Sequence, residues 1–357
     1  MNNRTKTKVL LALSGGVDSA VAAWLLQKRG FDVTAAFMKM WSDEAGILGH
    51  CPYKEDRRDA CKVASRLGIP IIVLDFENEY RREVLSGFFE SYARGETPNP
   101  DIFCNSRIKF PFLRRTADDL GIRFVATGHY ARLRRDKQGR THLLKARDRE
   151  KDQTYFLSDL TKADLANTIF PIGQLVKSEV RAIAKKAGLT VHDKRSTRGI
   201  CFVGKVSLPK FLRQKIQARP GKIISQSGET LGRHQDISSL TVGQRHGVGL
   251  GGGRPYYVTQ IDIKENTVFV SADEKDLYQK TARLRDIHWI SGAPAKSRKL
   301  FARPRYRAEL SEVVLENDLV VFKKPQRALT PGQSVVFYSG AECLGQGIIK
   351  FAKTREK

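Results

Sequence analysis

Cysteine is scarce in this chain of 357 residues, and no two cysteines form a CxxC pair. An odd number of cysteines in a long chain argues against a structural disulfide framework, and the lack of CxxC pairs removes the usual signature of a zinc site. Long apolar runs are also lacking, so we expect no membrane-spanning segment. The first expected strand begins at Val9, which leaves no room for a cleavable targeting segment, and we expect a cytoplasmic protein. The cysteines are Cys51, Cys61, Cys104, Cys201 and Cys343.

Acidic residues are strongly outnumbered. The chain has 63 Lys and Arg against 38 Asp and Glu, a net charge of +25. Such an excess predicts a polyanionic partner, nucleic acid first, whereas general basicity that aids solubility is the plainer alternative. The distribution favours a binding surface, because residues 201–260 contain nine Lys or Arg and only two acids, Glu229 and Asp236.

The order of patterned segments predicts three domains. Strand-like and helix-like segments alternate up to about residue 205, which is typical of a doubly wound, mostly parallel α/β sheet. Short β-rich runs with Gly, Asn and Asp turns then predict a small β-rich central domain and a C-terminal β-barrel. We place the domains at 1–207, 208–275 and 276–357. The nearly all-apolar run at residues 70–76 predicts a strand buried inside the sheet.

The strongest local motif is Ser14-Gly15-Gly16-Val17-Asp18-Ser19, between an expected strand and an expected helix. Glycines let the backbone approach phosphate oxygens, and the start of a helix presents unpaired N–H groups to them. The two serines add hydroxyl donors, and Asp18 is a candidate for holding Mg²⁺ on a pyrophosphate. The pattern resembles the signature of ATP pyrophosphatases, which cut ATP between its α and β phosphates. An ordinary glycine turn with a serine cap is the alternative.

Two other glycine patterns are rejected. The run from Gly199 to Lys205 fits G-x-x-x-x-G-K, but Val206 replaces the hydroxyl residue that would bind magnesium. Gly247, Gly249 and Gly252 fit G-x-G-x-x-G, but a strand-like run follows where a dinucleotide site needs a helix. The second pattern predicts a loop that touches RNA, or a flexible hinge.

Two cysteines are candidate nucleophiles. Cys104 ends the run Pro98-Asn99-Pro100-Asp101-Ile102-Phe103-Cys104 close to an expected helix start, where the dipole and nearby Arg107 and Lys109 should lower the pKa of the thiol. Asp101 is a candidate general acid or base, or a helix cap. Cys201 has apolar neighbours. A buried cysteine without chemistry is the alternative for both, and the sequence alone cannot bring them together.

A family resemblance covers nearly the whole chain. It is carried by the phosphate motif at 14–19, PNPDIFCN at 98–105, ATGHY at 126–130, KDQTYFL at 151–157 and STRGICF at 196–202. It continues through PGKI at 220–223, TVGQR at 241–245, RYR at 305–307 and TPGQS at 330–334. In this order the motifs resemble the tRNA-specific 2-thiouridylase family. Arg198 is a departure, because the more usual motif has Thr at that position.

The resemblance implies an enzyme that adenylates the 2-carbonyl oxygen of the wobble uridine and replaces it with sulfur, releasing AMP and pyrophosphate. Cys201 would carry a persulfide, Cys104 would be its partner nucleophile, and the two would form a redox pair. ATP and Mg²⁺ are the implied cofactors. The implied partners are tRNAs for Lys, Glu and Gln and an upstream sulfur carrier or cysteine desulfurase. No role is assigned to Cys51, Cys61 or Cys343.

The resemblance also assigns binding residues. Those for ATP are Ala12, Leu13, Ser14, Gly15, Gly16, Val17, Asp18, Ser19, Met38 and Gly128. Those for the target base or the rest of the tRNA are Asn99, Pro100, Asp101, His129, Lys151, Asp152, Gln153, Arg305, Tyr306 and Gln333. A core role for His129 and a solvated strand face for Arg305 are the alternatives.

Two other functions and one other source of the sulfur stay open at this point. An amide-forming synthetase or a lysidine-type ligase would share the phosphate motif and would not need paired thiols. A non-catalytic RNA-binding protein would bind tRNA without releasing pyrophosphate. An iron–sulfur cluster held by Cys104, Cys201 and Asp101 could supply the sulfur, but two cysteines fall short of the usual four.

Overall fold

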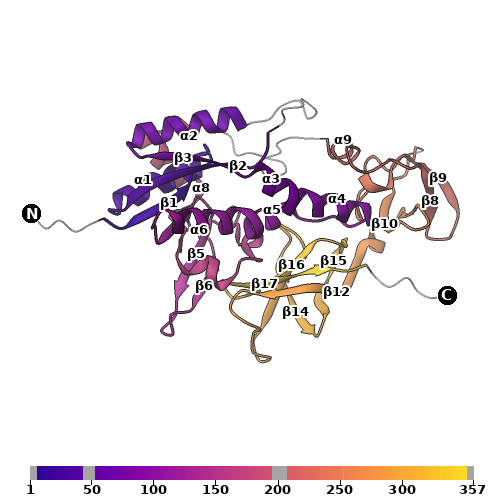
Figure 1. Cartoon of the computed structure of the whole chain (residues 1–357). Helices are drawn as coiled ribbons and strands as arrows, with labels where there is room; N and C mark the ends of the chain where they lie inside the picture. The colour runs from indigo at the N-terminus through magenta and orange to yellow at the C-terminus, as the bar shows by residue number, and fades with distance from the viewer. Residues whose placement is uncertain (1–5, 43–52, 195–206, 252, 352–357) are drawn as a thin grey trace, which may run out of the picture.

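The computed structural model describes residues 6–42, 53–194, 207–251 and 253–351. Its first part is a five-stranded parallel sheet in the order β3-β2-β1-β4-β7, covered by helices on both faces (Figure 1). The doubly wound α/β domain predicted from the sequence is confirmed. Its strands are β1 (Lys8–Ala12), β2 (Asp32–Lys39), β3 (Ile71–Asp75), β4 (Phe124–Thr127) and β7 (Thr168–Ile169).

The apolar strand residues supply two cores. Successive side chains of a strand point to opposite faces of the sheet. Val9 and Leu11 therefore pack on one face, with α1 (Val17–Lys28), α2 (Tyr53–Leu67) and α8 (Lys177–Lys186). Leu10 packs on the other face, in a cluster that also contains Met38 and Cys104.

Strand β3 differs from its prediction. It lies at the edge of the sheet, and Val73 is 42% exposed. Apolar composition alone does not separate an edge strand from a central one, because the position of a strand depends on which neighbours pair with it.

Two helical runs on the second face contain π-helical turns. The first comprises α3 (Glu77–Tyr80), a π-helix at Arg81–Leu85 and α4 (Ser86–Ala93). The second comprises α5 (Pro100–Phe103), a π-helix at Cys104–Lys109 and α6 (Phe110–Asp119). The sequence predicted a helix start close to Cys104, and the helical run begins at Pro100, four residues before it. π-Helical turns are frequent at functional sites.

A β-hairpin leaves the first domain and joins the barrel. It consists of β5 (Ala131–Arg135) and β6 (Thr141–Lys145), and Leu143 and Leu144 pair with β17 (Glu342–Ile349). This hairpin was not predicted. Short elements follow it, the 3₁₀-helix Thr154–Leu157 and α7 (Lys162–Ala166).

The remaining chain forms the two predicted β-rich parts. The central part has α9 (Leu208–Leu212), a 3₁₀-helix at Ile237–Ser239 and a sheet in the order β10-β11-β8-β9. Its strands are β8 (Gly221–Ser225), β9 (Thr230–His234), β10 (Tyr257–Asp262) and β11 (Thr267–Ser271).

After the 3₁₀-helix Glu274–Leu277, the last strands follow the order β12-β15-β14-β13-β16-β17, and β12 also pairs with β17, which closes the barrel. The predicted C-terminal barrel is confirmed. The other strands are β12 (Tyr278–Trp289), β13 (Leu300–Arg303), β14 (Ser311–Glu316), β15 (Leu319–Arg327) and β16 (Ser334–Ser339).

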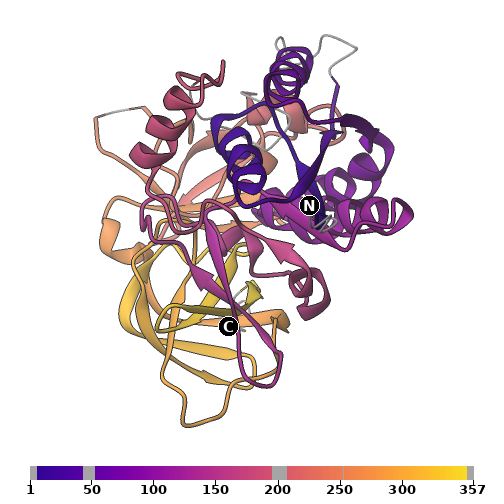
Figure 2. The same cartoon turned by 90° about the vertical axis from the view of Figure 1, so that its left-hand side faces the viewer.

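The three parts lie against one another. In Figure 1, α4 extends from the parallel sheet toward the central part, and the barrel lies below both. Figure 2 shows the barrel and the β5–β6 hairpin side by side, in agreement with their pairing. Within the described ranges, none of the helices has the length and apolar character needed to span a bilayer.

Candidate active site

The Ser14–Ser19 segment, here called the phosphate loop, connects the end of β1 to the start of α1. Gly15 has a positive φ of 76°, and a Cβ at this position would overlap the backbone carbonyl of Asp56. Gly16 is the extended N-cap residue of α1. The hydroxyls of Ser14 and Ser19 lie 3.1 Å apart, and the Ser14 N–H donates to the Ser19 hydroxyl at 3.2 Å. The loop therefore has the compact, glycine-dependent form that suits phosphate binding at a helix N-terminus.

The other predicted ATP residues gather at the same edge of the sheet. β1 and β4 are neighbours although they are far apart in the chain, and this is the switch point at which doubly wound sheets bind ligands. Gly128 follows β4, and a Cβ there would lie 2.6 Å from the Ser19 nitrogen. Met38 lies near the end of β2 and is buried, as are Leu13 and Val17.

Asp18 already has partners. Both of its carboxylate oxygens accept hydrogen bonds from Lys177 Nζ at 2.7 Å, and the Tyr130 hydroxyl donates to Oδ1 at 2.8 Å. Burial, followed by the Asp18 charge, raises the pKa of Tyr130 far above its ordinary value, so this hydroxyl keeps its proton. Sequence reasoning missed Lys177. The available signal was a lysine at the first position of a helix, where the helix dipole disfavours a cation.

The donor set around Asp18 suits magnesium that arrives with a nucleotide. Mg²⁺ is usually held by one or two carboxylates together with substrate phosphates. Asp18 is the one acidic residue of the phosphate loop. Among the described residues no group of three or more His, Cys, Asp or Glu could hold a metal ion by itself. Asp18 is therefore the carboxylate that the phosphate loop offers, and phosphates would have to complete the coordination.

The Pro98–Asp101 segment, here called the PNPD segment, begins the helical run that carries Cys104. The Asn99 side chain caps α5 by accepting from the Asp101 and Ile102 N–H groups at 3.2 and 3.4 Å, and Pro100 occupies the first turn. Cys104 follows α5 as the first residue of the π-helix. The cap fixes where Cys104 lies.

The predicted pKa of Cys104 was wrong in direction. The thiol is 1% exposed, and burial raises its pKa to about 11, with the negative charge of Asp101 adding to the rise and Lys109 opposing it. Arg107 contributes little, because its guanidinium stacks on Phe103 at 4.3 Å and donates to the Glu83 carbonyl. The thiol also lies one helical turn after the N-cap, too far along for the dipole to outweigh desolvation.

Cys201, Cys51 and Arg198 lie outside the described residues, as does the rejected Gly199–Lys205 pattern. The described chain on both sides of the Cys201 segment is firmly anchored. Before it, Lys194 forms ion pairs with Asp56 and Asp59 of α2 at 2.7 and 2.6 Å. After it, Phe211 of α9 belongs to the same hydrophobic cluster as Cys104.

The two other described cysteines, Cys61 and Cys343, lie on other elements than Cys104. Cys61 is exposed on α2, and Cys343 is buried in β17. No role is assigned to either.

Three predicted tRNA contacts are bonded within the protein. Asp152 is 2% exposed and accepts from the Ala146 N–H and the Thr154 hydroxyl. Gln153 accepts from the Tyr130 N–H at 2.9 Å. His129 Nδ1 lies 2.7 Å from the Thr127 hydroxyl, and burial lowers the pKa of its imidazole well below the usual value.

These positions favour a structural role for Asp152 and Gln153 and the core-histidine alternative for His129. Contact with tRNA stays a prediction for all three, and for Lys151, which lies beside them at the surface of the turn.

The predicted barrel residues approach the PNPD segment. Gln333 donates to the Thr97 carbonyl at 2.6 Å. The Tyr306 ring lies 4.4 Å from that of Phe156 and 5.9 Å from that of Tyr155. Arg305 donates to the Arg327 carbonyl at 3.1 Å. Their roles in binding tRNA stay predictions, but the structure brings two of them next to the candidate base-binding loop.

Residues 95–97 are where all three domains meet, here called the junction. The Thr97 hydroxyl lies 3.2 Å from that of Thr241 in the central domain, and the Thr97 N–H donates to the Pro331 carbonyl of the barrel at 2.8 Å. Glu96 is 6% exposed and pairs with Arg285 of β12 at 3.0 Å. The position of the PNPD segment is thus set by contacts from two other domains.

Comparisons with known proteins agree with this architecture. Three family models match consecutive parts of the chain. They are described as tRNA methyl transferase HUP domain at residues 7–205, tRNA methyl transferase PRC-barrel domain at 209–272 and aminomethyltransferase beta-barrel domain at 279–349. The predicted boundaries at 207/208 and 275/276 stay a prediction.

Relatives match over the full length. The protein named tRNA-specific 2-thiouridylase MnmA of Pediococcus pentosaceus is 41% identical over 100% of this chain and 98% of its own. A protein of the same name from Enterococcus faecalis is 43% identical over 100% of this chain and 99% of its own. This chain belongs to the tRNA-specific 2-thiouridylase family.

Membership of the 2-thiouridylase family agrees with the use of ATP at the phosphate loop. Solved structures with some likeness include the NMN synthetase of Francisella tularensis, at 20% identity and a TM-score of 0.35 over 55% of this chain and 68% of that chain. A 4-thiouridine synthetase–RNA complex with bound ATP has 19% identity and a TM-score of 0.36 over 58% and 50%. Scores this low carry no argument about either fold or function.

Proposed function

We propose that this 2-thiouridylase family member replaces the 2-oxygen of the wobble uridine of tRNA with sulfur, at the expense of ATP. The observation that carries the proposal is the common core below the phosphate loop. Leu10 of β1, Met38 at the predicted adenosine site and Cys104 belong to one packed cluster. A nucleotide-binding edge and a candidate nucleophile are thereby joined by rigid, buried side chains.

ATP is required by the chemistry of the substrate. The 2-carbonyl of uracil is urea-like and a poor electrophile, and its oxygen is a poor leaving group. Attack of that oxygen on the α-phosphate bonds AMP to the base and releases pyrophosphate. The later departure of AMP removes the oxygen. The phosphate loop and the N-terminus of α1 would stabilise the charge on the pyrophosphate.

Asp18 and Lys177 would have different roles at the phosphates. Asp18 would hold Mg²⁺, which supplies charge neutralisation on the phosphate oxygens when bound. Lys177 now pairs with Asp18 at 2.7 Å, and its ammonium would be released toward the leaving pyrophosphate once Asp18 turns to the metal. Tyr130 stays protonated and keeps the carboxylate oriented.

The sulfur step uses both cysteines. The substrate sulfur is the outer atom of a persulfide on Cys201. The Cys104 thiolate attacks the inner sulfur, forms a Cys104–Cys201 disulfide and frees hydrosulfide, which attacks C2 and displaces AMP. A dithiol reductant then returns two electrons to the disulfide. An upstream sulfur carrier or cysteine desulfurase would reload Cys201.

The remaining predicted contacts serve binding of the tRNA. Asn99, Pro100 and Asp101 would face the flipped base. Tyr306 and Phe156 are partly exposed and would offer stacking surfaces. They lie beside the same helical run, because Asn105 next to Cys104 donates to the Phe156 carbonyl at 3.1 Å. Wobble uridines of tRNAs for Lys, Glu and Gln are the proposed substrates, by family resemblance.

Methyl transfer is a second candidate, because two of the matching family models carry that description. The phosphate loop argues against it. A methyl donor needs no ATP pyrophosphate site and no pair of thiols, whereas the geometry around Ser14–Ser19 suits a nucleotide triphosphate.

The test is mass spectrometry of nucleosides from unmodified tRNA, incubated with the protein, ATP, Mg²⁺, a cysteine desulfurase with cysteine to load the persulfide, and a dithiol reductant. A 2-thiouridine peak that needs ATP and is lost in both Cys104→Ser and Cys201→Ser supports the whole scheme, and Cys61→Ser is the matched control. If either of these two variants turned over at the wild-type rate, the proposed two-thiol step would be wrong. Iron bound in proportion to activity would favour the cluster alternative. A methylated nucleoside would overturn the proposal.

A further inference from the structure

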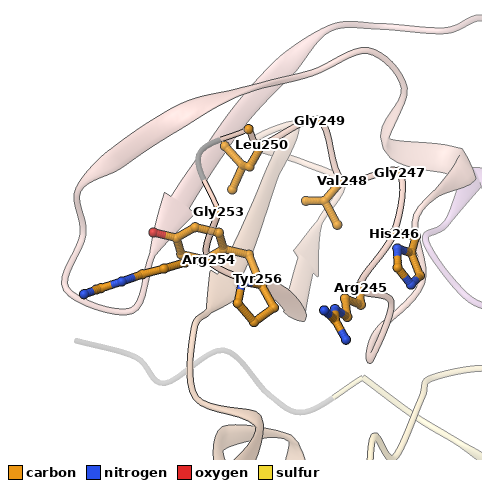
Figure 3. A pocket seen from close by; sticks show the side chains of 11 residues that line it. Arg245, His246, Gly247, Val248, Gly249, Leu250, Gly253, Arg254 and Tyr256 are labelled. Carbon is orange, nitrogen blue, oxygen red and sulfur yellow. The ribbon is translucent and has the colours of Figure 1, made fainter.

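An open cavity lies in the central domain, in the glycine-rich turn before β10. It has a volume of about 350 Å³ and lies between Arg245 and Tyr256 in the sequence (Figure 3). The sequence had predicted a loop that touches RNA or a hinge. The G-x-G-x-x-G pattern is followed by β10, so a dinucleotide site is excluded by the same argument as before.

The loop alternates small and apolar residues. Val248 is 4% exposed and belongs to the core of the central domain, and Leu250 packs against that core. Gly247, Gly249 and Gly251 are exposed. The apolar side chains therefore fix the loop to the domain, while the glycines present bare backbone to the outside.

The exposed backbone has unused donors. No N–H group of residues 245–251 donates a hydrogen bond to any group in the part of the chain that the structure describes. Gly247 and Gly249 have positive φ values of 75° and 95°, which other residues rarely adopt. A glycine loop of this kind lets an anion come close to peptide N–H groups.

Unpaired cations flank these donors. Arg245, His246 and Arg254 are exposed and make no ion pair with the described residues. No acidic residue occurs between Thr241 and Gln260. Figure 3 places Arg245 and His246 at one side of the cavity and Arg254 at the other, with the Arg254 side chain extending away from it.

The base of the loop is rigid and tied to the junction. Gln244 accepts from the Thr241 N–H at 3.0 Å and donates to the His246 carbonyl at 2.8 Å. Thr241 in turn lies 3.2 Å from Thr97, two residues before Asn99. The cations at the loop are therefore held at a fixed position relative to the PNPD segment.

We propose that the cavity lined by residues 245–251 and 253–256 binds the phosphate backbone of the tRNA substrate, with Arg245 and Arg254 on different phosphates and the N–H groups of Gly247, Gly249 and Gly251 between them. This proposal rests on the proposed function, since it names a second contact surface for the same substrate. The placement of the two arginines at opposite sides of the cavity fits an extended polyanion, because a single small anion would need convergent donors. Tyr256 lines the cavity and offers an aromatic edge to a ribose or base.

The experiment measures binding of an unmodified tRNA transcript to the full-length protein over a range of salt concentrations. Each lost phosphate contact lowers the slope of log Kd against log salt by about 0.7–0.9. The double variant Arg245→Ala/Arg254→Ala should therefore lower the slope by about 1.5. In the thiolation assay its KM for tRNA should rise while kcat is kept, because neither residue touches the reacting atoms.

The matched control is Lys222→Ala/Lys264→Ala. It removes the same charge from exposed positions of the same domain outside the cavity. An equal loss of slope in the control would mean diffuse attraction without a site, and it would overturn the proposal. A wild-type slope in the arginine variant would do the same. Unchanged far-UV circular dichroism establishes that both variants are folded.

Two further outcomes separate this proposal from others. If tRNA binding is unchanged, and thiolation falls only when sulfur comes from a protein donor and not from inorganic sulfide, the cavity binds that donor and the RNA proposal is wrong. If the wild-type protein neither binds nor thiolates tRNA, the proposed function itself fails. If only the cavity proposal is wrong, the wild-type protein still binds and thiolates tRNA.

Discussion

The reactivity of Cys104 in the free protein follows from its burial. Its pKa is raised from 9.0 to about 11, so at neutral pH the thiolate is about 100-fold rarer than for an ordinary cysteine. The thiol is also 1% exposed, and a reagent reaches it only after local opening. We therefore expect iodoacetamide to modify Cys104 at least about 100-fold more slowly than an exposed thiol.

The assay is peptide mass spectrometry after timed alkylation between pH 6 and 10. Cys61 is exposed on α2 and serves as the internal reference, and buried Cys343 reports on global opening. Two variants have opposite expected effects. Asp101→Asn removes a negative charge that raises the pKa of Cys104 and should speed alkylation, whereas Lys109→Ala removes an opposing positive charge and should slow it.

Alkylation of Cys104 as fast as Cys61 at pH 7, or a rate that levels off below pH 9, would refute this reasoning. So would a slower reaction in Asp101→Asn. Because attack on a persulfide requires a thiolate, we expect ATP and tRNA together to raise the reactivity of Cys104. The free enzyme would thus be protected from futile oxidation.

Three further predictions concern other residues. Lys177→Met should slow pyrophosphate release about 100-fold, as loss of a charge-stabilising donor does, while Lys185→Met on the same helix should not. Glu96→Gln removes the buried charge that pairs with Arg285, which then keeps only its partner Asp286, and it should lower the unfolding free energy by about 1–3 kcal/mol. The loss should be smaller than for a fully buried pair because Arg285 is 32% exposed, and Glu316→Gln is the denaturation control. The pKa of His142 is raised, first by Glu342, so its contribution to stability is full below pH ~6.5 and is lost as pH rises through the folded pKa. His142→Gln should therefore lower Tm more at pH 6 than at pH 9.

The phosphate loop was predictable because its chemistry is local. A strand, two glycines and a helix start lie within a dozen residues, and the structure folds them as expected. The contact between Lys177 and Asp18 was not predictable, because 159 positions separate the two residues in the chain. The wrong pKa of Cys104 has a related cause. Sequence shows charged neighbours, but desolvation depends on Leu10, Met38 and Phe211, which only packing brings there.

The sequence by itself determined the family, the order of the three folds and the phosphate loop, since these depend on short motifs and on the period of apolar residues. Only the tertiary structure decided that β3 lies at an edge, that β5 and β6 extend the barrel sheet, and that the three domains meet at Glu96 and Thr97. Those features depend on contacts between distant residues. Local propensity carries no information about them, because strand pairing and burial are settled by the partner and not by the segment.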